Sequence, residues 1–391
     1  MQTLFEHPLF IPVIVILVIL LGAPLGALYV GLVERKVLAD FQARLGPMRV
    51  GPHGLLQPIA DALKLLVKED TIPTEADRAL FWYAPCLSVF TALVALSTIP
   101  WTQKFFVADV NVGILIVSAM SSIGILGIII GGWSSNSHYP LLGALRSAAQ
   151  LVSYEVALAF ALLSGVMVAG TLSMQEIVRA QMDRRVWFVF ENFGLMILPF
   201  FIYLVAATAE TNRTPFDLPE AESELVAGFH TEYSGLRWAL FMLAEYTNMF
   251  VVSAVAVTLF WGGWLRPFPN VAWLEIPLNM GVPALLFIAA GLLCFPLSRK
   301  VKSPPHRTGL VVVGVLCILA VTPFLVPAIS LAIAPLFWFF AKMFVFLYCL
   351  IWFRGTFPRF RYDQLMNIGW KRMIPLGMAA LMINAVVGAL R

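Results

Sequence analysis

The sequence predicts an all-α polytopic membrane protein with about ten transmembrane helices. Of its 391 residues, 60% are hydrophobic and only 12% are charged, and the mean hydropathy is +0.87. Apolar runs long enough to cross about 30 Å of hydrocarbon recur along the whole chain. We therefore expect a single membrane domain, residues 1–391, with spans at 9–33, 79–100, 112–132, 148–170, 187–209, 237–262, 281–297, 309–327, 329–352 and 373–390.

The basic residues predict the orientation of these spans. With both termini outside, the inward-facing segments carry 18 Lys and Arg residues and the outward-facing segments carry six. Loops on the cytoplasmic side of membrane proteins are enriched in Lys and Arg, so we expect the N-terminus and the C-terminus to lie outside. The net charge of +4 then reflects a basic inner face and gives no reason to expect nucleic-acid binding.

The first inward segment, residues 34–78, is too polar to span the membrane. Glycine and proline residues between 46 and 54 predict a turning loop. From about residue 57, polar side chains recur every three or four positions, which predicts an amphipathic helix with one polar stripe: Gln57, Asp61, Lys64 and Lys68. We expect this helix to lie along the membrane surface, where a ligand arriving from the lipid would meet it first. Simple packing on neighbouring spans is the alternative.

A second inward segment, residues 210–236, is the most acidic part of the chain. Five carboxylates fall within fifteen residues and a sixth follows: Glu210, Asp217, Glu220, Glu222, Glu224 and Glu232. They lie between two apolar runs, where mutual repulsion and burial would raise their pKa values. Such groups suit a proton-handling site, although a solvated acidic loop would show the same composition.

Three further charges, Glu155, Glu245 and Lys342, lie well inside predicted spans. Each costs roughly 2.5–3.5 kcal/mol if left unpaired at the centre of a bilayer, so each needs a partner or a wet cavity. Counted from the inner ends of their spans, all three are expected in one layer near the midplane. We therefore expect a shared hydrophilic path, with a structural salt bridge of Lys342 to either glutamate as the alternative.

Redox cofactors have no visible ligands in this chain. The cysteines Cys86, Cys294, Cys317 and Cys349 all lie in apolar runs, and no Cys-x-x-Cys, paired-histidine or glycine-rich nucleotide motif is present. We expect no metal site and no bound cofactor. If the protein serves redox chemistry, its partners must supply the cofactors.

Long motifs in the chain resemble those of one family, the H subunits of bacterial NADH:quinone oxidoreductase, which are the counterparts of mitochondrial complex I subunit 1. The segments that carry the resemblance are Val33–Lys36, Gln42–Pro47, Gly54–Lys64, Gly132–Ser137, Ser153–Glu155, Glu210–Glu224, Glu232–Gly235, Ala244–Asn248 and Pro358–Met366. The resemblance implies a membrane-arm subunit at the junction with the peripheral arm, in the bacterial inner membrane, with FMN and iron–sulfur clusters in partner subunits of the complex. It implies that Arg35, Gln42, Arg44 and Asp61 help to form a chamber for the substrate quinone. It also implies that the acidic residues and Lys342 take part in a proton path.

The chain departs from the family pattern of eight spans at residues 270–328. There it inserts a predicted two-helix hairpin with a basic loop that would suit anionic lipid head groups.

Two other interpretations of the function remain open. The chain could be the membrane subunit of an energy-converting hydrogenase, or an autonomous ion transporter, although it lacks the internal repeat that transporters often show.

Overall fold

The computed structural model describes residues 10–217, 227–300 and 304–390. Within these ranges all regular structure is helical, and nine helices are long and apolar enough to cross a membrane. The predicted fold class, an all-α polytopic membrane protein, is therefore confirmed. The helices are α2 (Phe10–Phe41), α3 (Gln57–Val67), α4 (Arg78–Ser97), α5 (Gly113–Ser134), α6 (His138–Ala169), α7 (Met174–Arg184), α8 (Ile197–Glu210), α10 (Gly235–Leu259), α11 (Val282–Lys300), α12 (Pro304–Leu319), α13 (Thr322–Leu325), α14 (Pro327–Thr356), α15 (Tyr362–Ile368) and α16 (Ile374–Ala389).

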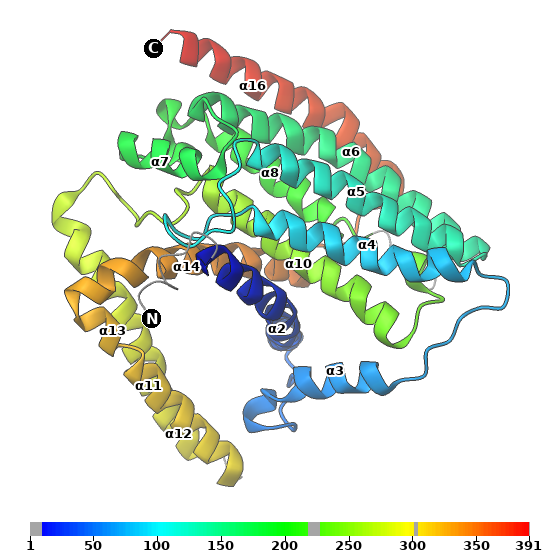
Figure 1. Cartoon of the computed structure of the whole chain (residues 1–391), viewed down its shortest axis with the longest axis horizontal. Helices are drawn as coiled ribbons and strands as arrows, with labels where there is room; N and C mark the ends of the chain where they lie inside the picture. Colours follow the sequence, from blue (N-terminus) through cyan, green and yellow to red (C-terminus); the bar gives the residue numbers. More distant parts are fainter. Residues whose placement is uncertain (1–9, 218–226, 301–303, 391) are drawn as a thin grey trace.

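A bundle of α4, α5, α6, α8, α10 and α16 forms the body of the molecule (Figure 1). Small residues bring these helices close together, as is common between membrane helices. At the α5–α6 crossing, a Cβ atom on Gly132 would lie only 2.3 Å from the Cβ atom of Ala144. This close packing holds the polar side chains on α5, α6 and α10 in fixed positions.

Several helices extend beyond the apolar runs that predicted them. α2 continues to Phe41, α6 already begins at His138, and α14 ends only at Thr356. Beyond Val33, α2 meets no glycine or proline before Gly46, and its next residues are good helix formers, so the helix continues into the polar segment. Charged residues that the sequence placed in loops, such as Glu34 and Arg354, therefore have helical backbones.

One predicted span is shorter than expected. The run 187–209 contains the 14-residue helix α8, preceded by two short 3₁₀ turns, Phe188–Phe190 and Asn192–Gly194. Asn192 and Phe193 have φ values of 51° and 57°, a conformation that interrupts any α-helix. Apolar composition alone cannot reveal this interruption.

The polar segment after α2 and the insertion before α14 both contain helices. The amphipathic helix appears as α3, connected to α2 by a turning loop that contains the 3₁₀ turn η1 (Pro52–Gly54). The inserted hairpin appears as α11 and α12, which pack mainly on each other and project away from the bundle (Figure 1).

Candidate functional site

A buried ion cluster joins three helices and the acidic segment. Arg213, only 3% exposed, donates from Nη1 to Oε1 of Glu34 at 2.7 Å, and its Nη2 lies 3.2 Å from Oε1 of Glu245. Glu34 also accepts from Arg354, and from the hydroxyl of Tyr246 at 2.9 Å. Burial alone would lower the pKa of Arg213, but Glu245 and Glu34 outweigh burial and raise that pKa well above its ordinary value. Arg213 is therefore permanently charged and shared by two carboxylates.

This ion cluster forms one wall of a cavity of about 750 Å³. Four arginines and three carboxylates contribute to its lining, together with apolar side chains. A cavity of this size and mixed polarity is typical of sites for small organic molecules. The lining residues are Glu34, Arg35, Leu38, Arg213, Asp217, Ala227, His230, Trp238, Met242, Glu245, Tyr246, Arg354 and Arg359.

Two of the four predicted quinone residues meet at one edge of this cavity. Nη1 of Arg35, on α2, donates to Oδ2 of Asp61, on α3, at 2.6 Å, and the Gln57 amide donates to the other Asp61 oxygen at 2.8 Å. The other two, Gln42 and Arg44, bond to each other at 2.6 Å in the exposed loop, and of the four residues only Arg35 lines the cavity. The structure thus brings Arg35 and Asp61 together and leaves Gln42 and Arg44 apart from them.

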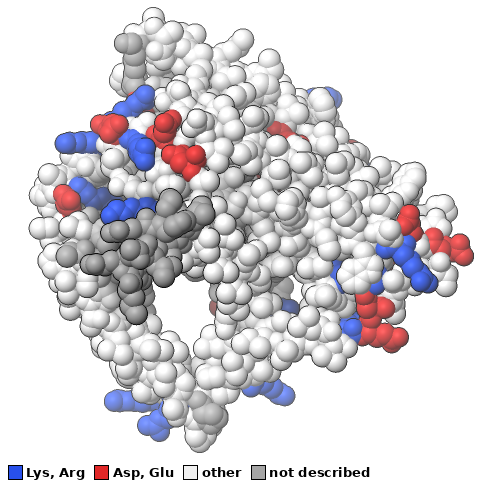
Figure 2. Space-filling view, in the orientation of Figure 1, with Lys and Arg blue, Asp and Glu red and all other residues white. Residues whose placement is uncertain are grey.

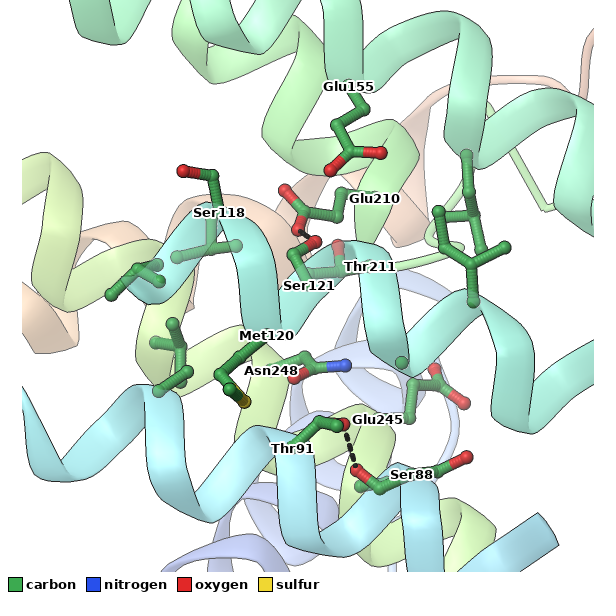
Figure 3. A pocket seen from close by; sticks show the side chains of 18 of the residues that line it. Ser88, Thr91, Ser118, Met120, Ser121, Glu155, Glu210, Thr211, Glu245 and Asn248 are labelled. Carbon is green, nitrogen blue, oxygen red and sulfur yellow. Dashed lines mark hydrogen bonds between the residues drawn. The ribbon is translucent and has the colours of Figure 1, made fainter. Parts of the chain in front are cut away.

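A second, narrower cavity of about 90 Å³ lies between α4, α5, α6, α8 and α10. Its lining includes Glu155, Glu210 and Glu245 with several serine and threonine hydroxyls. Ser121 donates to Glu210 and Ser122 donates to Glu155. Glu155 and Glu210 point toward each other (Figure 3). One water needs roughly 10–15 Å³ of such space, so this cavity, although lined mainly by apolar side chains, has room for several waters beside its carboxylates.

Glu245 lines both cavities. On one side its carboxylate interacts with Arg213 of the ion cluster, and on the other it belongs to the group that includes Glu210 and Glu155. Carboxylates connected by water can exchange protons, and each proton transfer changes the charge that the neighbouring groups experience. Glu245 is thus a proton-binding group common to the linings of both cavities.

The rest of the acidic segment is only partly described. Asp217 accepts from Arg359 at 2.8 Å, close to the buried ring of His230, and Glu232 is half-buried before α10. Burial lowers the pKa of His230 to about 4, although the charge of Asp217 opposes that shift. Glu220, Glu222 and Glu224 lie outside the described residues.

Lys342 does not lie in the predicted layer. Its Nζ donates to the backbone carbonyls of Trp261 at 2.6 Å and Leu265 at 2.9 Å, just beyond the end of α10, and lies over the ring of Trp187. Glu245 lies about 20 Å away along α10, at 1.5 Å per residue. The expectation of one shared layer is therefore wrong for Lys342, and so is a salt bridge with either Glu155 or Glu245. The four residues by which α14 extends past the predicted run account for about 6 Å of this separation.

Sequence reasoning missed most of the ion cluster. Glu34, Arg213, Tyr246 and Arg354 all occur in or beside segments that carry the family resemblance, but none was selected as a site residue. The available signal was an arginine within the most acidic segment: a cation surrounded by carboxylates near a membrane edge is a natural ion-pair partner.

The described residues offer no evident metal centre. In ranges 10–217, 227–300 and 304–390, no three His, Cys, Asp or Glu side chains converge as metal ligands would. The four cysteines are free thiols on separate helices or helix faces.

Comparisons with known proteins assign the chain to a family. The family model described as NADH dehydrogenase matches residues 13–385. An H subunit of NADH-quinone oxidoreductase from Solibacter usitatus (strain Ellin6076), the one numbered 2, is 68% identical over 390 residues, covering 100% of this chain and 99% of that protein. The H subunit numbered 1 from Koribacter versatilis (strain Ellin345) is 50% identical, with 95% and 90% covered. The H subunit from Paramagnetospirillum magneticum (strain ATCC 700264 / AMB-1) is 41% identical, with 98% and 94% covered.

Proposed function

The chain belongs to the NADH dehydrogenase family and is a membrane subunit of an NADH:quinone oxidoreductase, and we propose that its two cavities connect quinone binding to proton movement. The larger cavity is assigned to the quinone head group and the narrow cavity to a proton path. The observation that carries the proposal is that Glu245 lines both cavities and interacts with the buried Arg213.

The chemistry of the larger cavity suits a quinone. Its four arginines can donate hydrogen bonds to the carbonyl oxygens of the ring and stabilise negative charge as these oxygens are reduced. The cavity lies beside α3, the surface helix that a substrate arriving through the lipid would meet. Arg35 and Asp61 are assigned to the cavity mouth, while Gln42 and Arg44 belong to the adjoining loop. These are binding roles, because the electrons come from a cofactor in a partner subunit.

The proton path follows from the charge balance at Arg213. Reduction of a quinone to a quinol consumes two electrons and two protons, so protons taken from neighbouring groups change the charge next to the ion cluster. A change in how strongly Arg213 holds Glu245 alters the proton affinity of that carboxylate. The adjacent narrow cavity then passes the change to Glu210 and Glu155, with Asp217 and Glu232 as acidic groups on the side of the larger cavity. Glu220, Glu222 and Glu224, which lie outside the described residues, are proposed to serve the same path from their sequence alone. Lys342 is left out of this path because it lies beyond the far end of α10.

The proposed membrane location and partner subunits rest on the family to which the chain belongs. We assign the chain to the bacterial inner membrane with both termini periplasmic, among membrane-arm and peripheral-arm subunits that carry FMN and iron–sulfur clusters. The hydrogenase alternative and the transporter alternative are not favoured, because the relatives are named as subunits of NADH-quinone oxidoreductase.

Substitutions at the cavity mouth test the quinone assignment. In the assembled complex, Arg35→Ala or Asp61→Asn should lower quinone reduction about tenfold or more, since each removes a charged hydrogen-bonding group. Oxidation of NADH by a soluble artificial acceptor should be unchanged. Arg49→Ala, which removes an exposed charge from the same segment, is the matched control. Normal quinone reduction in both cavity variants would contradict the assignment.

A further inference from the structure

The inserted hairpin encloses an opening in the molecule. In Figure 2 a gap passes between the hairpin and the part of the chain formed by α2 and α3. Two contacts frame this gap at its ends, one between rings on α11 and α14 and one between α12 and η1. We call this framed gap the hairpin window.

Both ends of the hairpin window are closed by side-chain packing. At the end near α14, the rings of Phe287, Phe324 and Phe337 pack with centroids 5.9–6.2 Å apart. At the other end, Gly309 of α12 lies so close to Pro52 that a Cβ atom there would lie 2.4 Å from the proline ring. The ring of His306 lies 6.3 Å from that of His53 in the same contact. The frame is therefore closed by this chain alone.

The long sides of the hairpin window are apolar. α2 buries a narrow stripe at every fourth position, Val15, Ile19, Ala23 and Ala27, and so leaves its flanks uncovered. Leu17 and Leu21 on these flanks are 52% and 67% exposed. On the hairpin, α11 and α12 cross closely at Gly291 and Gly314 and expose their leucines outward. Surfaces of this kind require a covering of hydrocarbon.

The end of the hairpin window near η1 is basic. Lys36 donates to the backbone carbonyl of His53, and Arg299 and Arg307 are exposed where α11 ends and α12 begins. Lys and Arg side chains gather at this end of the hairpin in Figure 2. The pKa of His53 is lowered by burial and by the charges of Lys36 and His306, which is the direction expected in a positive environment. Asp40, one turn after Lys36, offsets part of this charge.

We propose that the hairpin window binds an anionic phospholipid, with its acyl chains between α2 and the hairpin and its phosphate against Lys36, Arg299 and Arg307. The two closed ends decide between possible occupants. A helix crossing the whole bilayer would have to continue past both ends of the frame, whereas a lipid of one leaflet ends inside it. A quinone has a neutral head group and would gain nothing from the basic end. The relative from Solibacter usitatus aligns with 100% of this chain, so it also has a segment at the hairpin position.

Removal of the two exposed arginines tests the proposal in the whole purified complex. We expect the wild-type complex, washed in mild detergent, to retain phosphatidylglycerol or cardiolipin that mass spectrometry can count. Arg299→Ala with Arg307→Ala should weaken retention of added phosphatidylglycerol about 30-fold, since each basic residue near a membrane surface contributes about fivefold to binding of anionic lipid. The double lysine variant should retain the lipid, and Arg266→Ala on a different loop should have no effect. Phosphatidylcholine should not replace the lost lipid.

A second variant tests the packing between α12 and η1 and leaves the charges unchanged. Gly309→Val should force α12 away from Pro52 and release the lipid while both arginines remain. Equal phosphatidylglycerol retention in the wild type, the double alanine variant and Gly309→Val would overturn the proposal. So would a polypeptide that copurifies with the wild type and is lost with these substitutions, or a change confined to the KM for quinone.

Discussion

Arg213 is the buried cation that pairs with both Glu34 and Glu245, and Glu245 lines both cavities. Replacing it with methionine would leave Glu34 and Glu245 buried without their shared cation, a change that typically costs about 3–5 kcal/mol. We expect Arg213→Met to lower the thermal stability of the complex and abolish most quinone reduction. Arg213→Lys should recover little, since one ammonium group cannot reproduce the two-sided guanidinium contact.

The measurements are the melting temperature of the purified complex and the amount of assembled complex in native gels. Arg361→Met is the matched control, because Arg361 and its partner Asp363 are both largely exposed, at 80% and 65%. Exposed ion pairs contribute little to stability, so this variant should be close to the wild type in stability. An Arg213→Met complex with wild-type stability and turnover would show that the ion cluster is dispensable.

His230 predicts a pH dependence of stability. Its pKa is lowered to about 4 in the folded chain against 6.5 for the free side chain, mainly by burial. Between these values the unfolded chain binds more protons, so stability falls as the pH falls from 6.5 toward 4. The full loss corresponds to about 3 kcal/mol. Melting temperatures at pH 7 and pH 5 should therefore differ more for the wild type than for His230→Leu. Equal differences would assign the acid sensitivity to other groups.

At the residue scale, the sequence predicted positions within one element better than contacts between elements. The polar stripe placed Asp61 on α3, and Glu155 and Glu245 line one cavity, while their part in a shared path stays a prediction. The ion cluster was not predictable, because Glu34 and Arg213 are 179 positions apart and meet only through tertiary packing. The depth estimate failed for Lys342, whose Nζ contacts the chain beyond the end of α10.

At the scale of elements, hydropathy located nine of the ten predicted spans among the described residues, but not their bounds, and the run 187–209 holds only the 14-residue helix α8. The apolar signal ends where charges begin, whereas α2, α6 and α14 continue because their polar residues are good helix formers. The helix α7 was missed although Ser173 and Glu176 mark its start: the Ser173 hydroxyl accepts from the Glu176 amide at 3.3 Å. Its mean composition is polar, so a search for spans passes over it.

Cysteine labelling tests the arrangement of the hairpin and the orientation of the chain. In a background without the four native cysteines, single cysteines at Thr308 and Asn367 should react only with reagents applied from the cytoplasmic side. A cysteine at Asn270 should react from the periplasmic side. All three positions are exposed in the structure. Labelling of Thr308 and Asn367 from opposite sides would be incompatible with two membrane-crossing helices in the insertion.

At the scale of the whole molecule, one bundle contains both cavities and one carboxylate joins them. α10 contributes Glu245 to the two cavities, α6 contributes Glu155, and the end of α8 contributes Glu210. We propose that a change of charge in the larger cavity reaches the narrow cavity through Glu245, without a large movement of helices. The central claim is that this continuity couples quinone reduction to proton translocation.

The most direct test is the proton-to-electron ratio of the complex in sealed vesicles. Glu155→Gln with Glu245→Gln keeps the shapes of both side chains but removes two proton-binding groups from the narrow cavity. We predict that proton translocation and quinone turnover fall together, while NADH oxidation by a soluble artificial acceptor is preserved. A double variant with the wild-type ratio and the wild-type rate would contradict the account and reduce Glu155 and Glu245 to structural roles.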